Sequence, residues 1–151
     1  GRFTVVKGNS MSPTLQNKNV IIIECLTSRF GKIRQGDIVV LQIPELLDNG
    51  MMYAIKRVIA TENQHVEIKN GKVYVDGVEL NEPYTNKELT WPGESEFDDY
   101  IVPDNCVYVL GDNRMPDKSK DSRIFGAVNK KRILGKCFIR LFPFSEAGEV
   151  Q

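Results

Sequence analysis

The chain has 151 residues, of which 41% are hydrophobic and 26% charged, and its twenty basic residues balance twenty acidic ones. This length favours one globular domain that buries about two-thirds of its unfolded surface. The balanced charge provides no overall positive field for a nucleic acid, so we expect no nucleic-acid partner. No stretch approaches the length of a membrane span, and no secretory leader pattern is present.

Runs rich in β-branched residues follow one another along the chain, each bounded by Gly, Asn, Asp or Pro. No stretch sustains the i, i+3, i+4, i+7 pattern of an amphipathic helix, so helix should be scarce and the chain mainly β. Residues 65–80 contain Asn-Gly and Asp-Gly between strand-like pieces, which predicts a β-hairpin. The expected strands lie within residues 3–7, 19–24, 36–43, 51–60, 65–80, 106–112 and 133–144.

Residues 81–100 differ from the rest because they are acidic, hold two prolines and show little periodicity. Such a stretch is typical of a long surface excursion that joins two β-rich parts. We therefore expect a single domain, 1–151. Its β core should comprise 1–60 and 106–151, and 61–105 should form an inserted hairpin followed by the excursion.

The three cysteines and the single histidine argue against a metal centre. Cys25, Cys106 and Cys137 are scattered without CxxC spacing, which favours buried small hydrophobic residues over a zinc site or a disulfide framework. His65 lies in an alternating, strand-like stretch that favours a surface or cross-strand position. We expect neither a metal nor another cofactor.

The segment GNSMSPTL, residues 8–15, places Ser10 in a turn directly after an apolar run. A serine hydroxyl is a poor nucleophile near neutral pH unless a neighbouring base takes its proton. The strand context of His65 leaves a Ser-His-Asp arrangement without support. Lysine is the remaining candidate for the base.

Lys56 differs from the other lysines because it lies inside the apolar run MMYAIKRVIA, residues 51–60. Burial disfavours the ammonium form, and a neutral amine there can act as a general base. The alternative is that the Lys56 side chain runs along the sheet and keeps its amine in water. Because strand residues alternate faces, Lys56 and Arg57 should not face the same side, which leaves open that one of them is solvated.

Residues 111–123, GDNRMPDKSKDSR, follow a predicted strand and collect residues that are common in solvated loops. Within this loop Ser119 is a candidate hydrogen-bond partner for a lysine amine. Asp121 and Arg123 are candidates for a charge pair that holds the loop. Two interpretations of this loop remain open. It is an ordinary solvated loop, or it carries functional residues, which are often found on loops held by a rigid sheet.

Taken in order, these segments resemble the motifs of type I signal peptidases, the serine–lysine proteases that remove secretory leaders. The matching stretches are SMSPTL at 10–15, GDIVV at 36–40, YAIKRVI at 53–59, GDNR at 111–114 with SKDSR at 119–123, and LFPFSE at 141–146. The resemblance implies a signal-peptidase-like fold of coiled antiparallel sheets with a long surface insertion. One departure is the four-residue spacer 115–118, where the family more often has two residues.

The resemblance also assigns roles to individual residues. Ser10 would be the nucleophile, Lys56 its general base, and Ser119 the residue that orients the lysine amine. The backbone N–H of Ser10 would bind the oxyanion together with Gly8, which has no hydroxyl and offers only its own N–H. The supporting residues implied by the family are Asp121, Arg123, Asp112 and Arg57.

The family's substrate is a secretory preprotein whose leader lies extended between strands that here fall near residues 5–7 and 53–55. We expect the pockets for small side chains to be lined by Val5, Val6, Ala54 and Ile55. Ordinary packing in the core accounts equally well for these apolar residues. Met11 and the LFPF segment are expected to form an apolar surface at the membrane. The family implies a bacterial cell-membrane location on the extracytoplasmic face and an N-terminal membrane anchor, and we expect this chain to be a soluble catalytic part without that anchor.

Two other functions compete with this interpretation. A self-cleaving SOS-repressor-type protease also uses a Ser–Lys pair, but it needs an Ala-Gly or Cys-Gly cleavage site before the serine. The nine residues before Ser10 contain neither dipeptide, and the chain's Ala-Gly at 147–148 follows the motifs. The other candidate is an inactive β-rich module that binds extended peptides without cutting them.

Overall fold

The computed structural model describes residues 2–24, 32–93 and 95–151, except for the side chains of residues 24, 95, 138, 139, 141, 142 and 144. The first strands are β1 (Arg2–Val5), β2 (Val20–Glu24), β3 (Ile38–Gln42), β4 (Tyr53–Thr61), β5 (His65–Lys69), β6 (Lys72–Val75) and β7 (Val78–Glu79). They are followed by β8 (Asp99–Ile101), β9 (Cys106–Leu110), β10 (Val128–Asn129), β11 (Ile133–Phe142) and β12 (Gly148–Glu149).

Helix is scarce in the described residues, as expected. The one α-helix there, α2 (Ser122–Phe125), has four residues, and none of the helices is long and apolar enough to cross a membrane. The remaining helical pieces are the 3-10 turns η1 (Pro44–Leu46), η2 (Pro83–Thr85), η3 (Ser95–Phe97), η4 (Lys130–Arg132) and η5 (Phe144–Glu146).

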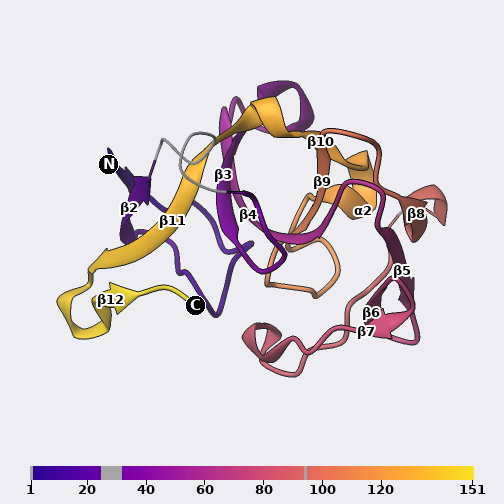
Figure 1. The fold of residues 1–151 in the computed structure, drawn as a ribbon. Coiled ribbons are helices and arrows are strands. Elements are labelled where there is room, and N and C mark those ends of the chain that lie inside the picture. The colour runs from indigo at the N-terminus through magenta and orange to yellow at the C-terminus, as the bar shows by residue number, and fades with distance from the viewer. Residues whose placement is uncertain (1, 25–31, 94) are drawn as a thin grey trace.

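The larger sheet has the strand order β1-β2-β11-β3-β4-β9-β10, with β12 added to β11 (Figure 1). The long strand β11 pairs with β3 through its first half and with β2 through its second half, and its register shifts at several points. Such irregularities bend a strand and increase its twist. The sheet therefore coils, and the edge strand β1 comes to line the same cavity as the start of β4.

Strand β4 is buried on both faces, because every residue from Lys56 to Ala60 is largely hidden from solvent. Two apolar clusters account for this. Val58 packs with residues of β3 and β9, whereas Ile59 and Ala60 pack with the second sheet. Between Lys56 and Ala60, a side chain of β4 therefore enters the protein interior whichever face it is on.

The smaller sheet has the order β7-β6-β5-β8. Its turns are where the sequence predicts them, since Asn70 and Gly71, and again Asp76 and Gly77, have the positive φ angles of tight hairpin turns. All four strands fall within 61–105, the segment that we interpret as an insertion into the β core. The mainly β architecture of coiled antiparallel sheets is confirmed.

Candidate active site

Ser10 lies in the turn that follows β1, and the loop after β9 holds this turn from the other side. The Asn113 N–H donates to the Ser10 carbonyl at 2.9 Å, and the Asn113 side chain donates to the Asn9 carbonyl at 3.1 Å. The Thr14 hydroxyl donates to Asp112 at 2.5 Å. Sequence reasoning assigned no role to Asn113 or Thr14, although both lie inside the motifs it singled out.

Lys56 is buried, with 3% of its surface exposed, and its Nζ donates a hydrogen bond to Ser119 Oγ at 3.0 Å. Burial lowers the pKa of this amine from 10.5 to about 8, and the nearby Asp121 carboxylate opposes that effect in part. The interpretation in which the amine reaches water is therefore wrong. A substantial fraction of Lys56 is neutral near pH 8, which is the form that can accept a proton.

Arg57 is buried like Lys56, so neither of the two neighbouring cations is solvated, although the alternation of strand residues left that possibility open. It is also 3% exposed, on the opposite face of β4, where its Nε and Nη2 donate to the two oxygens of Asp112 at 2.9 and 2.7 Å. Its guanidinium also lies over the Tyr84 ring, 3.8 Å from the ring centroid. Successive side chains of a strand point to opposite faces, so Arg57 lies on the other face of β4 from Lys56. Because that face is also covered, Arg57 is buried as well.

Asp121 and Arg123 form a buried ion pair, with Arg123 Nε and Nη2 donating to the two carboxylate oxygens at 2.9 and 2.8 Å. Burial raises the pKa of Asp121, but the Arg123 guanidinium outweighs it and holds the pKa below its usual value. Asp121 also accepts from the Gly111 N–H at 3.0 Å. A Cβ on Gly111 would lie 2.2 Å from Ser119 Oγ and 2.5 Å from the Ser10 carbonyl oxygen, so glycine lets the two serine-bearing segments approach.

Arg114 is a structural residue that sequence reasoning missed. It is fully buried and donates to the Gly111 carbonyl at 2.7 Å, to Thr90 at 2.9 Å and to both oxygens of Glu82. The hydroxyl of Tyr84 donates to the same Glu82 carboxylate at 2.8 Å. Residues of the 81–100 excursion thus support the loop that follows β9. The signal that could have identified it is its position as the arginine of the GDNR motif, because a buried arginine requires an acidic partner.

A cavity of about 730 Å³ connects these elements and is lined by both Ser10 and Lys56. The described residues contain no hydrogen bond of the Ser10 hydroxyl, and catalytic hydrogen bonds are often long before substrate binds. One wall comes from the end of β1 and the turn after it, and the other from the segment before β4 and its first residues. The four expected pocket residues, Val5, Val6, Ala54 and Ile55, all contribute to this lining.

Two expectations near Ser10 need correction. The Gly8 N–H donates to the Asn17 side-chain oxygen at 2.9 Å, so it is not a free oxyanion donor here. Met11 is 1% exposed and packs in a core cluster with Val6 and Leu15, so it forms no surface for a membrane. The Leu and Phe side chains of the LFPF segment, 141–144, lie outside the described residues.

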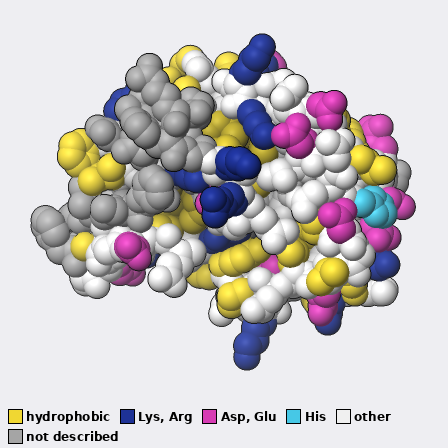
Figure 2. Space-filling model, in the orientation of Figure 1, with side chains coloured by type: hydrophobic (Ala, Val, Ile, Leu, Met, Phe, Trp, Pro, Cys, Tyr) yellow, Lys and Arg dark blue, Asp and Glu magenta, His cyan; other side chains and the backbone are white. Residues whose placement is uncertain are grey.

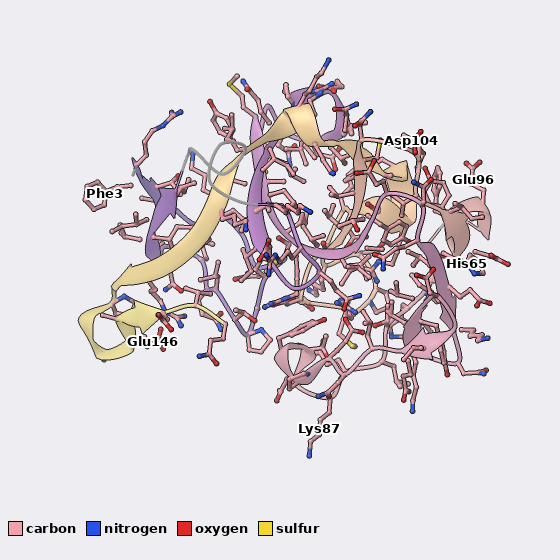
Figure 3. All side chains as sticks on the ribbon, in the orientation of Figure 1. Phe3, His65, Lys87, Glu96, Asp104 and Glu146 are labelled. Carbon is pink, nitrogen blue, oxygen red and sulfur yellow. The ribbon has the colours of Figure 1, made fainter. Side chains whose placement is uncertain are left out.

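One group of described residues has the ligand types for a metal ion. The donor atoms of His65, Glu67 and Asp99 lie within 4.8 Å of one another on the second sheet. His65 has the predicted cross-strand position, with Nε2 2.5 Å from Asp99 Oδ1. It lies on β5 of the second sheet, at the side of the molecule (Figure 3). None of the three residues lines the cavity that holds Ser10 and Lys56, so the group plays no part in this site.

Comparison with known proteins assigns the family. The model of the family described as signal peptidase, peptidase S26, matches residues 2–142. The chain belongs to this signal peptidase family. It is 37% identical over 150 residues to a probable signal peptidase I-1 of Synechocystis sp., covering 96% of this chain and 73% of that protein. It is 36% identical over 152 residues to signal peptidase I of Bacillus caldolyticus, covering 94% and 80% respectively.

A solved signal peptidase I from Enterococcus faecalis has the same kind of fold. The superposition has a TM-score of 0.54 at 30% sequence identity, and it covers 70% of this chain and 96% of the other. Together with the curated relatives, this match supports the main functional interpretation over the SOS-repressor alternative. Membership of the signal peptidase family makes the chain a peptidase whose substrates are preproteins.

Proposed function

We propose that this signal peptidase cuts secretory leaders by a serine–lysine mechanism, with Ser10 as nucleophile and Lys56 as general base. The observation that carries the proposal is the buried Lys56 amine, which has a pKa of about 8 and lines the same cavity as Ser10. An amine with such a pKa is matched to proton transfer near neutral pH. Ser119 orients this amine through the 3.0 Å hydrogen bond.

The proposed reaction is acyl transfer. Neutral Lys56 takes the Ser10 proton as Oγ attacks the scissile carbonyl, and the resulting ammonium gives that proton to the departing amine. The same lysine then deprotonates a water molecule, which hydrolyses the ester bond between the acyl group and Ser10 Oγ. The ammonium returns the proton to Ser10 Oγ. The Ser10 N–H makes no hydrogen bond in the described part of the chain, so it is available to the oxyanion. Gly8 becomes a second donor only if it releases Asn17.

Strand edges support an extended substrate. Within the described residues, β1 pairs only with β2, and β4 pairs with β9 only from Arg57 onward. The free edge of β1 and the free edge of residues 53–56 both border the cavity. A substrate strand inserted there gains backbone hydrogen bonds from both walls. The nearly buried Val6 and Ala54 then provide apolar walls for the small side chains of an A-x-A cleavage site.

Large apolar side chains at the cavity rim support contact with a membrane surface. Phe3 does not line the cavity, but it lies on the neighbouring strand β1, is 70% exposed and projects outward (Figure 3). Exposed apolar groups concentrated on one rim are typical of an interaction surface. We propose that this rim rests on the extracytoplasmic face of a bacterial membrane. The exposed apolar residues that line the rim are Val5, Met51, Met52 and Tyr53.

The decisive experiment is cleavage of a preprotein with an A-x-A leader in detergent, using the unmodified chain, Ser10→Ala and Lys56→Ala. We expect cutting after the second Ala by the unmodified chain, and a loss of at least about 10³-fold in kcat/KM for both variants. Circular dichroism of both variants checks that the fold is retained. Cutting that survives Lys56→Ala would assign the base elsewhere, whereas binding without any cutting would favour the peptide-binding module.

A further inference from the structure

The cavity lining carries an excess of positive charge that the neutral chain as a whole does not have. Besides Lys56, three lysines contribute to the lining, namely Lys7, Lys118 and Lys120, whereas Asp48 is its one carboxylate among the described residues. Figure 2 shows Lys and Arg side chains gathered near the centre of the visible face, beside a hollow with hydrophobic side chains. A cleft lined with one sign of charge concentrates ligands of the opposite sign.

Lys118 and Lys120 are tied to the reacting groups by their position in the chain. They flank Ser119, whose hydroxyl accepts the Lys56 hydrogen bond at 3.0 Å. Lys118 closes the spacer 115–118, which is longer here than is usual in the family. A charged group that a substrate brings close to the scissile bond therefore comes within reach of both side chains.

These two lysines are available to a ligand. Lys118 is exposed and has no ion pair among the described residues. Lys120 pairs with Asp48 at 3.1 Å, but Asp48 is 72% exposed, and an ion pair in such a setting contributes little. A substrate carboxylate can replace Asp48 at small cost.

We propose that Lys118 and Lys120, assisted by Lys7, bind acidic side chains of the preprotein close to the scissile bond. The chain then prefers leaders whose cleavage region carries Asp or Glu over those that carry Lys. This inference rests on the proposed peptidase function and adds a substrate class to it. We assign the lysines to the peptide and not to a lipid headgroup, because they line the cavity that holds Ser10 and Lys56.

The test uses a peptide series with one A-x-A site, in which Asp, Asn or Lys is placed in turn at each position near the cut other than the two alanines. We expect kcat/KM for the Asp peptide to exceed that for the Lys peptide by roughly threefold to tenfold at one or more positions. This ratio should approach one in 1 M NaCl, where charges are screened within about 3 Å. Affinities of the same peptides for the Ser10→Ala chain provide a readout that is independent of turnover.

Matched variants assign the effect to the cleft. Lys118→Gln/Lys120→Gln should bring the Asp-to-Lys ratio close to one, whereas Asp48→Asn should raise it. The control Lys87→Gln/Lys131→Gln removes the same charge from exposed lysines outside the cavity and should keep the ratio; Lys87 projects away from the molecule (Figure 3).

Failure of this inference differs from failure of the proposed function. Equal cutting and equal affinity of the Asp and Lys peptides would overturn the inference and leave the peptidase intact. Absence of cutting would defeat the proposed function, and the affinities would still decide the inference. If the lysine variant lost binding only to phosphatidylglycerol vesicles, with an unchanged peptide ratio, the lysines would serve a lipid surface and the inference would be wrong.

Discussion

Lys56 Nζ lies 3.0 Å from Ser119 Oγ, although the two residues are 63 positions apart in the chain. The hydrogen bond joins a strand buried on both faces to the loop that also carries Asp121 and Arg123. Ser119 gives the lysine amine a neutral hydrogen-bond partner, which does not favour the ammonium form as a carboxylate would. The amine therefore stays hydrogen-bonded while burial keeps its pKa near 8.

The pH dependence of cleavage follows from this pKa. Only neutral Lys56 accepts the Ser10 proton, so kcat/KM should rise about tenfold per pH unit below pH 8 and level off above it. The measurement is kcat/KM for one leader peptide between pH 5.5 and 10, with circular dichroism at each pH to verify folding. A profile that is flat across pH 7–9 would contradict Lys56 as the base.

Replacement of Lys56 should separate activity from stability. The pKa is about 8 in the folded chain and 10.5 when exposed, a difference that costs about 3 kcal/mol of folding free energy below pH 8. Because the folded pKa is the lower one, this cost disappears as pH rises from 8 to 10.5. Lys56→Met should therefore abolish cleavage and raise the free energy of unfolding by about 1–3 kcal/mol at pH 7.

Urea unfolding of both chains at pH 7 and pH 10 measures the effect of Lys56→Met. The advantage of the variant should shrink at pH 10, because the folded-state lysine is then neutral and the pH is close to the unfolded-state pKa of 10.5, so little of the desolvation cost remains. A variant that is less stable than the unmodified chain at pH 7 would show that packing and the Ser119 hydrogen bond outweigh desolvation.

Two buried serines, Ser119 in the loop after β9 and Ser122 at the start of α2, should respond differently to removal of the hydroxyl. Ser119→Ala leaves the Lys56 amine without its partner, so kcat should fall by about 10²-fold and the pH profile should shift. Ser122→Ala removes the acceptor of the Val109 N–H and should lower stability by about 1–2 kcal/mol without a change in pH profile. Steady-state kinetics and urea unfolding of both variants check this contrast, and equal kinetic defects would contradict an orienting role for Ser119.

Gly111→Ala should disturb the site by steric overlap alone. The added Cβ would lie 2.2 Å from Ser119 Oγ and 2.5 Å from the Ser10 carbonyl oxygen, and backbone cannot move aside cheaply. We expect a loss of at least about 10²-fold in kcat/KM and of about 1–3 kcal/mol in stability. Gly77→Ala is the control, since its Cβ meets nothing within 4 Å and only its positive φ is strained. The idea fails if Gly111→Ala retains the activity of that control.

The sequence predicts the strands, the hairpin turns and the three motif-bearing segments well, because these depend on local features. Runs rich in β-branched and other apolar residues mark β3, β4 and β9, and the Asn-Gly and Asp-Gly pairs require the positive φ angles that they adopt. The short strands β8, β10 and β12 escaped prediction. Each has two or three residues and exists through pairing with a longer neighbour.

Burial was the property that local patterns described least well. Arg57 resembles a solvated strand residue in the sequence, yet tertiary packing covers both faces of β4 and pairs it with Asp112. Met11 resembles an exposed apolar residue of a turn, yet it packs in the core. Local patterns also did not show that the Gly8 N–H is occupied, because its acceptor Asn17 comes from the far end of the same turn.

The sequence by itself determined the residue types of the site, their order and the family, since these are carried by short motifs in a row. Only the tertiary structure decided which of those residues meet. The coiling of the sheet at β11, the close approach at Gly111 and the Arg114–Glu82 contact bring segments together that are up to about a hundred residues apart. The Lys56 pKa is likewise a tertiary property, because desolvation depends on every element packed around the amine.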